Sequence, residues 1–238
     1  MMAASEFEFK YRFWIFGALF CIAFSSYSID PQNTGAGLVE WIARLRGTPA
    51  ATADYHVIFA VAALFCIAAA AVRTWGTAYL NPEVMVDTQM HSSSLVIDGP
   101  YRYVRNPLYF GNILLAIGFG LMASRIGFVV LVLGMIFFDY RLILREEAGI
   151  AENLGERFLA YCAAVPRLLP ALRPQLHSAG RVPNWPDGFL GEAFMWVMAA
   201  SVVAFAISLN LRVYFVVLAS AFVVYAICIA IIKRRQKT

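Results

Sequence analysis

The chain has 238 residues, of which 61% are hydrophobic and only 14% are charged, and its mean hydropathy is +0.68. Soluble domains carry about a quarter charged residues, so this composition excludes an ordinary soluble protein and indicates an integral membrane protein. The net charge is +4, and the four cysteines and three histidines are scattered without the spacing of metal ligands. We therefore expect a bilayer as the environment, with no metal and no nucleic acid among the partners.

Six apolar segments approach or reach the roughly 17 to 25 residues that a helix needs to cross a bilayer. They are Phe13–Ile29, His56–Leu80, Pro107–Ala123, Gly127–Leu144, Gly191–Asn210 and Val213–Ile232. The sequence thus predicts an all-α fold: a polytopic transmembrane helical bundle of about six spans, with polar loops and a charged helix outside the membrane. The link between the third and fourth segments is so short that these two must form an antiparallel hairpin. A further short helix, over Leu38–Leu45, is expected at the membrane interface.

Basic residues indicate which side of the bundle faces the cytoplasm. Six spans place both termini on one side, and fifteen of the nineteen Lys and Arg residues fall on that side. By the positive-inside rule this side is cytoplasmic. We expect a protein of the inner or plasma membrane, with both termini and any active site on the cytoplasmic side. Arg73, near the end of the second span, is expected to snorkel to the headgroups.

A polar, aromatic stretch, GPYRYVRNPLY from Gly99 to Tyr109, interrupts the apolar chain just before the third span. It opens on Gly-Pro, a turn pair. It closes on Asn106-Pro107, where the residue before proline is biased away from helix and proline suits the first helical position. We interpret it as a loop at the mouth of a span that presents Arg102 and Arg105 at the membrane surface.

A second charged stretch, Arg141 to Pro170, continues the fourth span. The helical period places Asp139, Leu142, Ile143 and Glu146 on one face. Asp139 lies in an apolar segment, where an ionisable residue is costly and usually points into the protein or a wet cavity. Carboxylates on this strip can face the arginines of the first stretch. For Arg105, Glu146 and Glu147 a functional role is favoured over a girdle of charges that only fixes helix ends.

These two stretches resemble the isoprenylcysteine carboxyl methyltransferases and the related membrane phospholipid methyltransferases. The family pattern runs roughly G-x-Y-x-x-x-R-H-P-x-Y-x-G, then E-E-x-x-L, G-x-x-Y-x-x-Y and V-P-R/T-x-x-P. The residues that match it are Gly99, Tyr101, Arg105, Pro107, Tyr109, Gly111, Glu146, Glu147, Gly155, Tyr161, Val165, Pro166, Arg167 and Pro170. Asn106 replaces the usual histidine, Ile150 a leucine and Phe158 a tyrosine. The resemblance covers 95–170 and leaves out the first two spans and the last hairpin.

The resemblance implies three parts: residues 1–94 with the N-terminal spans, 95–170 as the methyltransferase core, and 171–238 as a linker and C-terminal hairpin. It implies S-adenosylmethionine as the cofactor and a membrane lipid, or a lipidated or amphipathic small molecule, as the substrate. Arg105 and Glu147 are then the expected catalytic residues, the first to position an anionic group and the second to balance charge or accept a proton. The expected cofactor-binding residues are Leu95, Val96, Gly99, Tyr103, Val104, Asn106, Pro107, Tyr109 and Glu146.

The methyl acceptor stays open between two chemistries. A phospholipid amine must be neutral to attack, which calls for a carboxylate as general base. A prenylcysteine-type carboxylate needs only an arginine to aim it. Two further readings are kept: a sterol-reductase-like membrane protein that uses NADPH, and a non-catalytic scaffold or carrier. The larger span number of the reductases and the glutamate pair here argue against the first. The absence of paired broken spans argues against a transporter.

Overall fold

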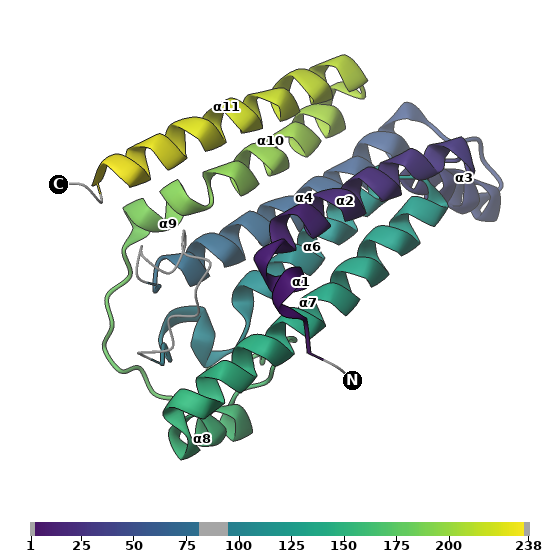
Figure 1. Ribbon diagram of the computed structural model, residues 1–238. Coiled ribbons are helices and arrows are strands. Elements are labelled where there is room, and N and C mark those ends of the chain that lie inside the picture. The colour runs from purple at the N-terminus through teal and green to yellow at the C-terminus, as the bar shows by residue number, and fades with distance from the viewer. Residues whose placement is uncertain (1–2, 81–94, 236–238) are drawn as a thin grey trace. The chain divides into compact units, whose positions relative to one another are not determined.

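The computed structural model describes residues 3–80 and 95–235, and within these ranges every regular element is a helix. The N-terminal part contains α1 (Glu6–Lys10), α2 (Arg12–Ser25), η1 (Ser26–Ser28), α3 (Thr34–Arg46) and α4 (Thr52–Thr77). The central part contains η2 (Gly99–Arg102), α6 (Pro107–Met122), α7 (Arg125–Leu154) and α8 (Glu156–Ala164). The C-terminal part contains α9 (Trp185–Gly191), α10 (Ala193–Ser208) and α11 (Leu211–Arg235) (Figure 1). The all-α prediction is confirmed.

The prediction of six spans is not confirmed. Among the described residues, α4 and α7 are long and apolar enough to cross a bilayer, and α9 with α10 would be a third span although the pair bends by 63°. The helix at the first predicted span and α6 are apolar but shorter, and so is the apolar part of α11. As expected, the charged stretch continues the helix of the fourth predicted span: α7 ends at Leu154 and contains residues 141–154 of that stretch in one 30-residue helix.

The described chain divides into two compact units. One comprises residues 1–15, 71–112 and 136–192, and the other comprises residues 16–70, 113–135 and 193–238. Both units draw on the long helices, so neither corresponds to a continuous stretch of sequence. The three-part division made above stays a prediction.

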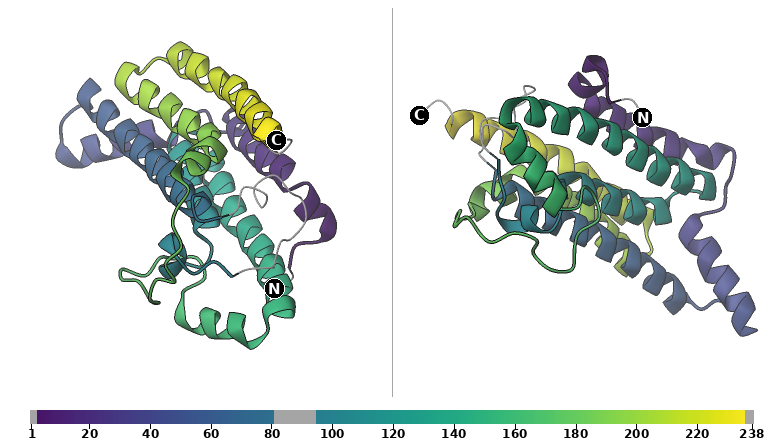
Figure 2. Two further views of the ribbon diagram at one scale, coloured as in Figure 1. Left: turned by 90° about the vertical axis from the view of Figure 1, so that its left-hand side faces the viewer. Right: turned by 90° about the horizontal axis from the view of Figure 1, so that it is seen from below.

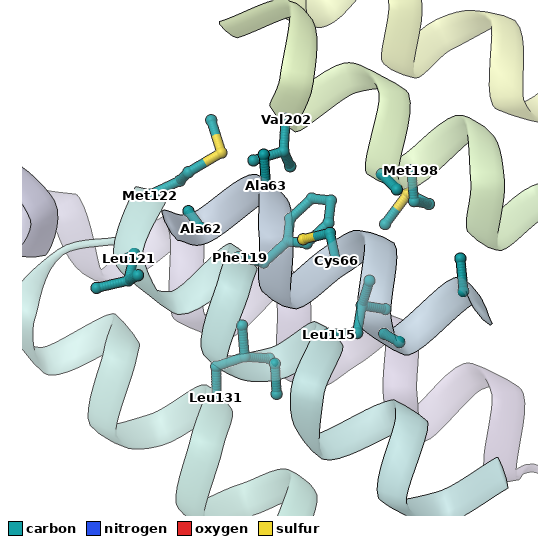
Figure 3. Close-up of a cluster of buried hydrophobic side chains, with 14 of the residues drawn as sticks. Ala62, Ala63, Cys66, Leu115, Phe119, Leu121, Met122, Leu131, Met198 and Val202 are labelled. Atoms are coloured by element: carbon teal, nitrogen blue, oxygen red, sulfur yellow. The ribbon is translucent and has the colours of Figure 1, made fainter. Parts of the chain in front are cut away.

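The second unit contains the main apolar core. Small residues of α4 face larger ones of α6 and α7, and α10 adds Met198 and Val202 (Figure 3). A Cβ at Gly118 of α6 would lie 2.5 Å from Sγ of Cys66 and 2.7 Å from the carbonyl oxygen of Ala62. Only glycine therefore permits this approach of α6 to α4. α10 and α11 lie side by side in the same unit (Figure 1).

Polar contacts in the second unit fix the short link between α6 and α7. The hydroxyl groups of Ser26 and Ser124 are 2.8 Å apart, and the Ser124 hydroxyl accepts a hydrogen bond from the backbone of Gly127 at 3.0 Å. Arg125 forms a bidentate ion pair with Asp30, in which Nη2 donates to Oδ1 at 2.9 Å and Nε donates to Oδ2 at 3.0 Å. Helix α3 includes the predicted short helix Leu38–Leu45.

Candidate active site

All the site residues described below lie in the first unit. The first predicted motif folds as a turn that requires its glycine. Gly99 begins η2 with φ +59°, a left-handed conformation that residues with a Cβ adopt at a cost. A Cβ at this position would also lie 2.4 Å from the ring of Tyr79. The motif then ends at Pro107, the first residue of α6, as predicted.

The second motif turns back at a glycine after α7. Gly155 has φ +52° and separates α7 from α8. The chain changes direction between these two helices (Figure 2). Three side chains at α8 form a buried cluster: Phe158, Tyr161 and Val165. Leu95 and Ile97, which precede the first motif in the chain, also pack against this cluster. The hydroxyl of Tyr161 donates to the carbonyl oxygen of Tyr101 at 2.8 Å. Burial raises the pKa of the Tyr161 phenol. The turn at Gly155 thus returns the chain to the first motif.

Backbone hydrogen bonds join the first motif to the second motif and to the segment that follows it. The amide of Arg105 donates to the carbonyl oxygen of Pro166 at 2.9 Å. Further along, the amide of Ala171 donates to Tyr103 at 2.9 Å and that of Gln175 donates to Arg102 at 2.8 Å. The two sequence motifs, 30 residues or more apart in the chain, therefore form one structure.

An ion-pair cluster at Glu147 lies where the motifs meet. Arg105 donates from Nε at 3.0 Å and from Nη2 at 3.3 Å to the two carboxylate oxygens of Glu147. Arg167 donates from Nε at 2.9 Å, and Asn106 donates from Nδ2 at 3.0 Å. The side chain of Arg105 is 8% exposed and that of Arg167 is 34% exposed. Arg105 thus meets Glu147, but no hydrogen bond between described residues joins it to Glu146, which accepts from Tyr109. Arg102 donates to the carbonyl oxygen of Leu176 and not to a carboxylate.

The guanidinium of Arg105 is fully engaged within the protein. Besides the two bonds to Glu147, its Nη1 donates to the carbonyl oxygens of Cys162 at 2.6 Å and Val165 at 3.2 Å. Glu147 likewise accepts from three side chains. The pair therefore fixes the second motif to the first, and the catalytic roles expected for these two residues stay predictions.

A second polar group lies between α6 and α7. Tyr109 donates to Glu146 at 2.7 Å, and one turn along α6 the amide of Asn112 donates to Asp139 at 3.2 Å. Asp139 is fully buried. Its expected inward orientation is confirmed, because Leu142 and Ile143 on the same face are fully buried too.

The other residues expected to bind the cofactor differ in burial and in what they contact. Val104 and Pro107 are buried, Leu95 and Val96 are partly buried, and the Tyr103 ring lies 5.8 Å from that of Trp75. The side-chain amide of Asn106 donates a second hydrogen bond, to the carbonyl oxygen of Arg167 at 3.0 Å. Asparagine thus has a structural role at the position where the family usually has histidine. Cofactor binding by these residues stays a prediction.

Arg73 has a partner that sequence reasoning missed. Its Nε and Nη2 donate to Glu192 at 2.7 and 3.0 Å, and its Nη1 donates to Asn112 at 2.7 Å and to the carbonyl oxygen of Leu108 at 3.2 Å. Thr77 adds a hydrogen bond to Glu192 at 2.9 Å. The prediction that Arg73 snorkels to the headgroups is wrong, because a carboxylate from beyond the motifs neutralises it. A lone glutamate next to an apolar run was the available signal.

Asp98 and helix α1 make two further sets of contacts that were not predicted from the sequence. Asp98 accepts from the Ser178 hydroxyl at 2.6 Å and from the amides of Ala179 and Arg181 at 2.8 and 2.9 Å. The bond from Ser178, followed by those from the two amides, holds the pKa of Asp98 below its usual value. In α1, Glu8 pairs with Arg141 of α7 at 2.7 Å. Both contacts fix segments outside the recognised motifs to the site.

Comparison with known proteins supplies a family for this region. Residues 57–157 match the family model described as phospholipid methyltransferase. The resemblance inferred from the motifs is confirmed. The match includes most of α4, which the motif resemblance left out, and it ends before Phe158. No match was found among curated proteins or among solved structures.

The matched segment contains most of the residues that form the two polar groups. Arg105, Asn106, Glu147, Tyr109 and Glu146 lie inside it. Arg167 and Glu192 lie outside it, although each forms an ion pair with an arginine or glutamate of the segment. The family and the apolar helices together indicate a membrane methyltransferase.

Proposed function

We propose that this protein transfers a methyl group from S-adenosylmethionine to the amine of a membrane phospholipid. The family match supports methyl transfer and a phospholipid substrate. The observation that favours an amine is the state of Arg105: every contact of its guanidinium described above is to Glu147 or to a backbone carbonyl. An arginine that is occupied in this way is poorly placed to aim an anionic carboxylate acceptor.

The charge of the second polar group supports the same choice. Among the described residues, neither Glu146 nor Asp139 has an ion-pair partner within 4.0 Å, while Glu147 and Glu192 are each neutralised by arginine. Two carboxylates without a paired cation favour positively charged ligands over negatively charged ones. A sulfonium donor and an ammonium acceptor both carry positive charge. The residues present therefore fit the implied cofactor in charge.

In this proposal the chain supplies positioning rather than covalent chemistry. S-adenosylmethionine, when bound, supplies the methyl group and a neutral leaving sulfide. The Tyr109–Glu146 pair would hold the cationic end of the donor near the start of α6. The Arg105–Glu147–Arg167 cluster would keep both motifs in the geometry for an in-line displacement, in which orientation of the reactants accounts for much of the rate. The site would lie on the cytoplasmic face, where the basic residues gather.

Ligand-induced stabilisation tests the donor. The purified full-length chain should melt at a higher temperature with S-adenosylhomocysteine, because a ligand that binds only the folded state stabilises it by mass action. NADPH should leave the melting temperature unchanged. A Glu146→Gln variant should lose the response, and Glu152→Gln, an exposed carboxylate on the same helix, should keep it. Stabilisation by NADPH alone would favour a reductase and overturn the proposal.

A labelling experiment tests the acceptor. The protein is incubated with a methyl-labelled donor and vesicles of total membrane lipid, and the products are identified by mass spectrometry. Label on a phospholipid nitrogen is the expected result. Label on a carboxylate as a base-labile ester would favour the prenylcysteine-type acceptor. Failure to label any lipid, in a protein that binds S-adenosylhomocysteine, would contradict a lipid acceptor.

A further inference from the structure

Asp139 is the carboxylate that lies deepest in the apolar part of α7. The twelve residues before it, 127–138, contain no charged side chain. Its own side chain is fully buried. A carboxylate at such a position is costly, and in membrane helices such residues typically mark a binding site or a proton pathway.

Only one of the two carboxylate oxygens of Asp139 accepts a hydrogen bond from a described residue. Its Oδ1 accepts the amide proton of Asn112 at 3.2 Å, whereas its Oδ2 is buried and accepts no hydrogen bond from any described residue. A carboxylate can accept about four hydrogen bonds, and buried polar atoms rarely lack a partner. The free oxygen is therefore available to a donor group that is not part of the described chain.

The neighbouring cation does not neutralise Asp139. Arg73 directs its donors to Glu192, to Asn112 and to the carbonyl oxygen of Leu108. Because Oδ1 of Asn112 accepts from Arg73, its amide group must point toward Asp139. The contacts of Arg73 and Glu192 thus hold Asp139 in place and leave its charge unpaired.

Asp139 and Glu146 are placed for two different cationic groups. They lie seven residues apart on one face of α7, which corresponds to about 10 Å along the axis at 1.5 Å per residue. Glu146, paired with Tyr109, lies toward the charged end of the helix, and Asp139 lies toward its apolar end. The two carboxylates therefore lie at different depths along α7, the deeper one suited to a group carried by a lipid and the other to a group of a soluble cofactor.

We propose that Asp139 binds the ammonium group of the lipid acceptor through Oδ2 and takes its proton before methyl transfer. This inference rests on the proposed function. In the first step an N–H bond of the ammonium breaks, the electron pair stays on nitrogen and the proton passes to Oδ2. In the second step the nitrogen lone pair forms the N–C bond while the C–S bond breaks and its pair goes to sulfur. Glu147 is the weaker candidate for this base, because four hydrogen bonds from three side chains already occupy both of its carboxylate oxygens.

An Asp139→Asn variant tests the assignment, because it keeps the size of the side chain while removing the charge. With a phospholipid amine as acceptor, we expect kcat/KM at pH 7 to fall by at least about 100-fold, the usual contribution of a positioned base. The melting-temperature response to S-adenosylhomocysteine should stay as in the wild type. Glu152→Gln, an exposed carboxylate on the same helix, should keep wild-type kcat/KM.

The pH profile separates this role from a structural one. Without the base, the reaction depends on the neutral amine already present, so the activity of Asp139→Asn should rise about tenfold per pH unit below the amine pKa. The wild type should rise less steeply. The charged and titratable groups around Asp139 are Arg73 from α4, Tyr109 from α6, Glu146 from α7 and Glu192 beyond α9, and all are unchanged in the variant.

Three outcomes would overturn the inference. A variant with kcat/KM within threefold of the wild type and the same pH profile would show that Asp139 is only an unpaired buried residue. Loss of activity together with loss of the S-adenosylhomocysteine response would show a role in donor binding or folding. A wild-type protein that methylates no amine would contradict the proposed function itself, and this inference with it.

Discussion

Replacing Glu147 should reveal how strongly the two motifs depend on one carboxylate. Glu147→Gln leaves the guanidinium groups of Arg105 and Arg167 facing each other without their shared anion. Breaking a buried ion pair by removing one partner costs about 3–5 kcal/mol. We use the lower figure, about 3 kcal/mol, because Arg167 is 34% exposed and water can solvate it in the variant.

This destabilisation corresponds to a measurable change in melting temperature. For a chain of 150–250 residues, 1 kcal/mol shifts the melting temperature by about 2–4 °C, so Glu147→Gln should melt roughly 6–12 °C below the wild type. Arg105→Gln should come close to this value, because the Arg105 side chain is 8% exposed. Arg167→Gln should cost only about 1 kcal/mol, as expected for a partly solvated pair.

A double variant provides the control. Arg105→Met combined with Glu147→Met removes both buried charges at once, and replacing a buried pair by apolar residues is often nearly neutral. The double variant should therefore melt above either single methionine variant, measured in the same detergent by intrinsic fluorescence. If it melts at or below the lower of the two, the pair does not act through mutual neutralisation, and the reasoning is refuted.

Three further predictions concern other parts of the chain. The pKa of Asp98 is lowered in the folded state, so the stability that this carboxylate contributes should be present above its ordinary pKa of 3.8 and lost as the pH falls through its folded-state pKa. An acid-unfolding series should show this loss in the wild type and not in Asp98→Asn. Gly118→Ala should destabilise the core by about 1–3 kcal/mol through overpacking, whereas Gly17→Ala, with no atom within 4 Å of the added Cβ, should be neutral or stabilising, and equal melting temperatures would contradict the close contact. Glu192→Gln should lower the melting temperature by more than Glu40→Gln, because Glu192 is buried against Arg73 while the Glu40 side chain is 47% exposed.

The site was largely predictable because its residues follow local rules. Gly-Pro and Asn-Pro mark the ends of the first motif, and the helical period places Asp139 and Glu146 on one face of α7. The cost of lone charges at a membrane edge indicated that Arg105 and Glu147 would lie close together, but not that they would form an ion pair. These inferences depend on chain-local geometry, which a single sequence contains.

Partners distant in the sequence were not predictable in the same way. Nothing in the local pattern around Arg73 indicates that its counter-charge is Glu192, 119 residues later, or that the Glu8 carboxylate binds Arg141. The count of six spans stays unconfirmed for a related reason. Apolar length alone does not show where a helix bends, as between α9 and α10.

The ion pair between Arg73 and Glu192 has a practical consequence for shortening the gene. A recombinant fragment cut to the family match, 57–157, would keep Arg73 and Arg141 but discard the carboxylates of Glu192 and Glu8. Such a fragment would leave two guanidinium groups of apolar helices without their carboxylate partners. Grafts, chimaeras and minimal enzymes based on this scaffold should therefore carry both flanking segments along.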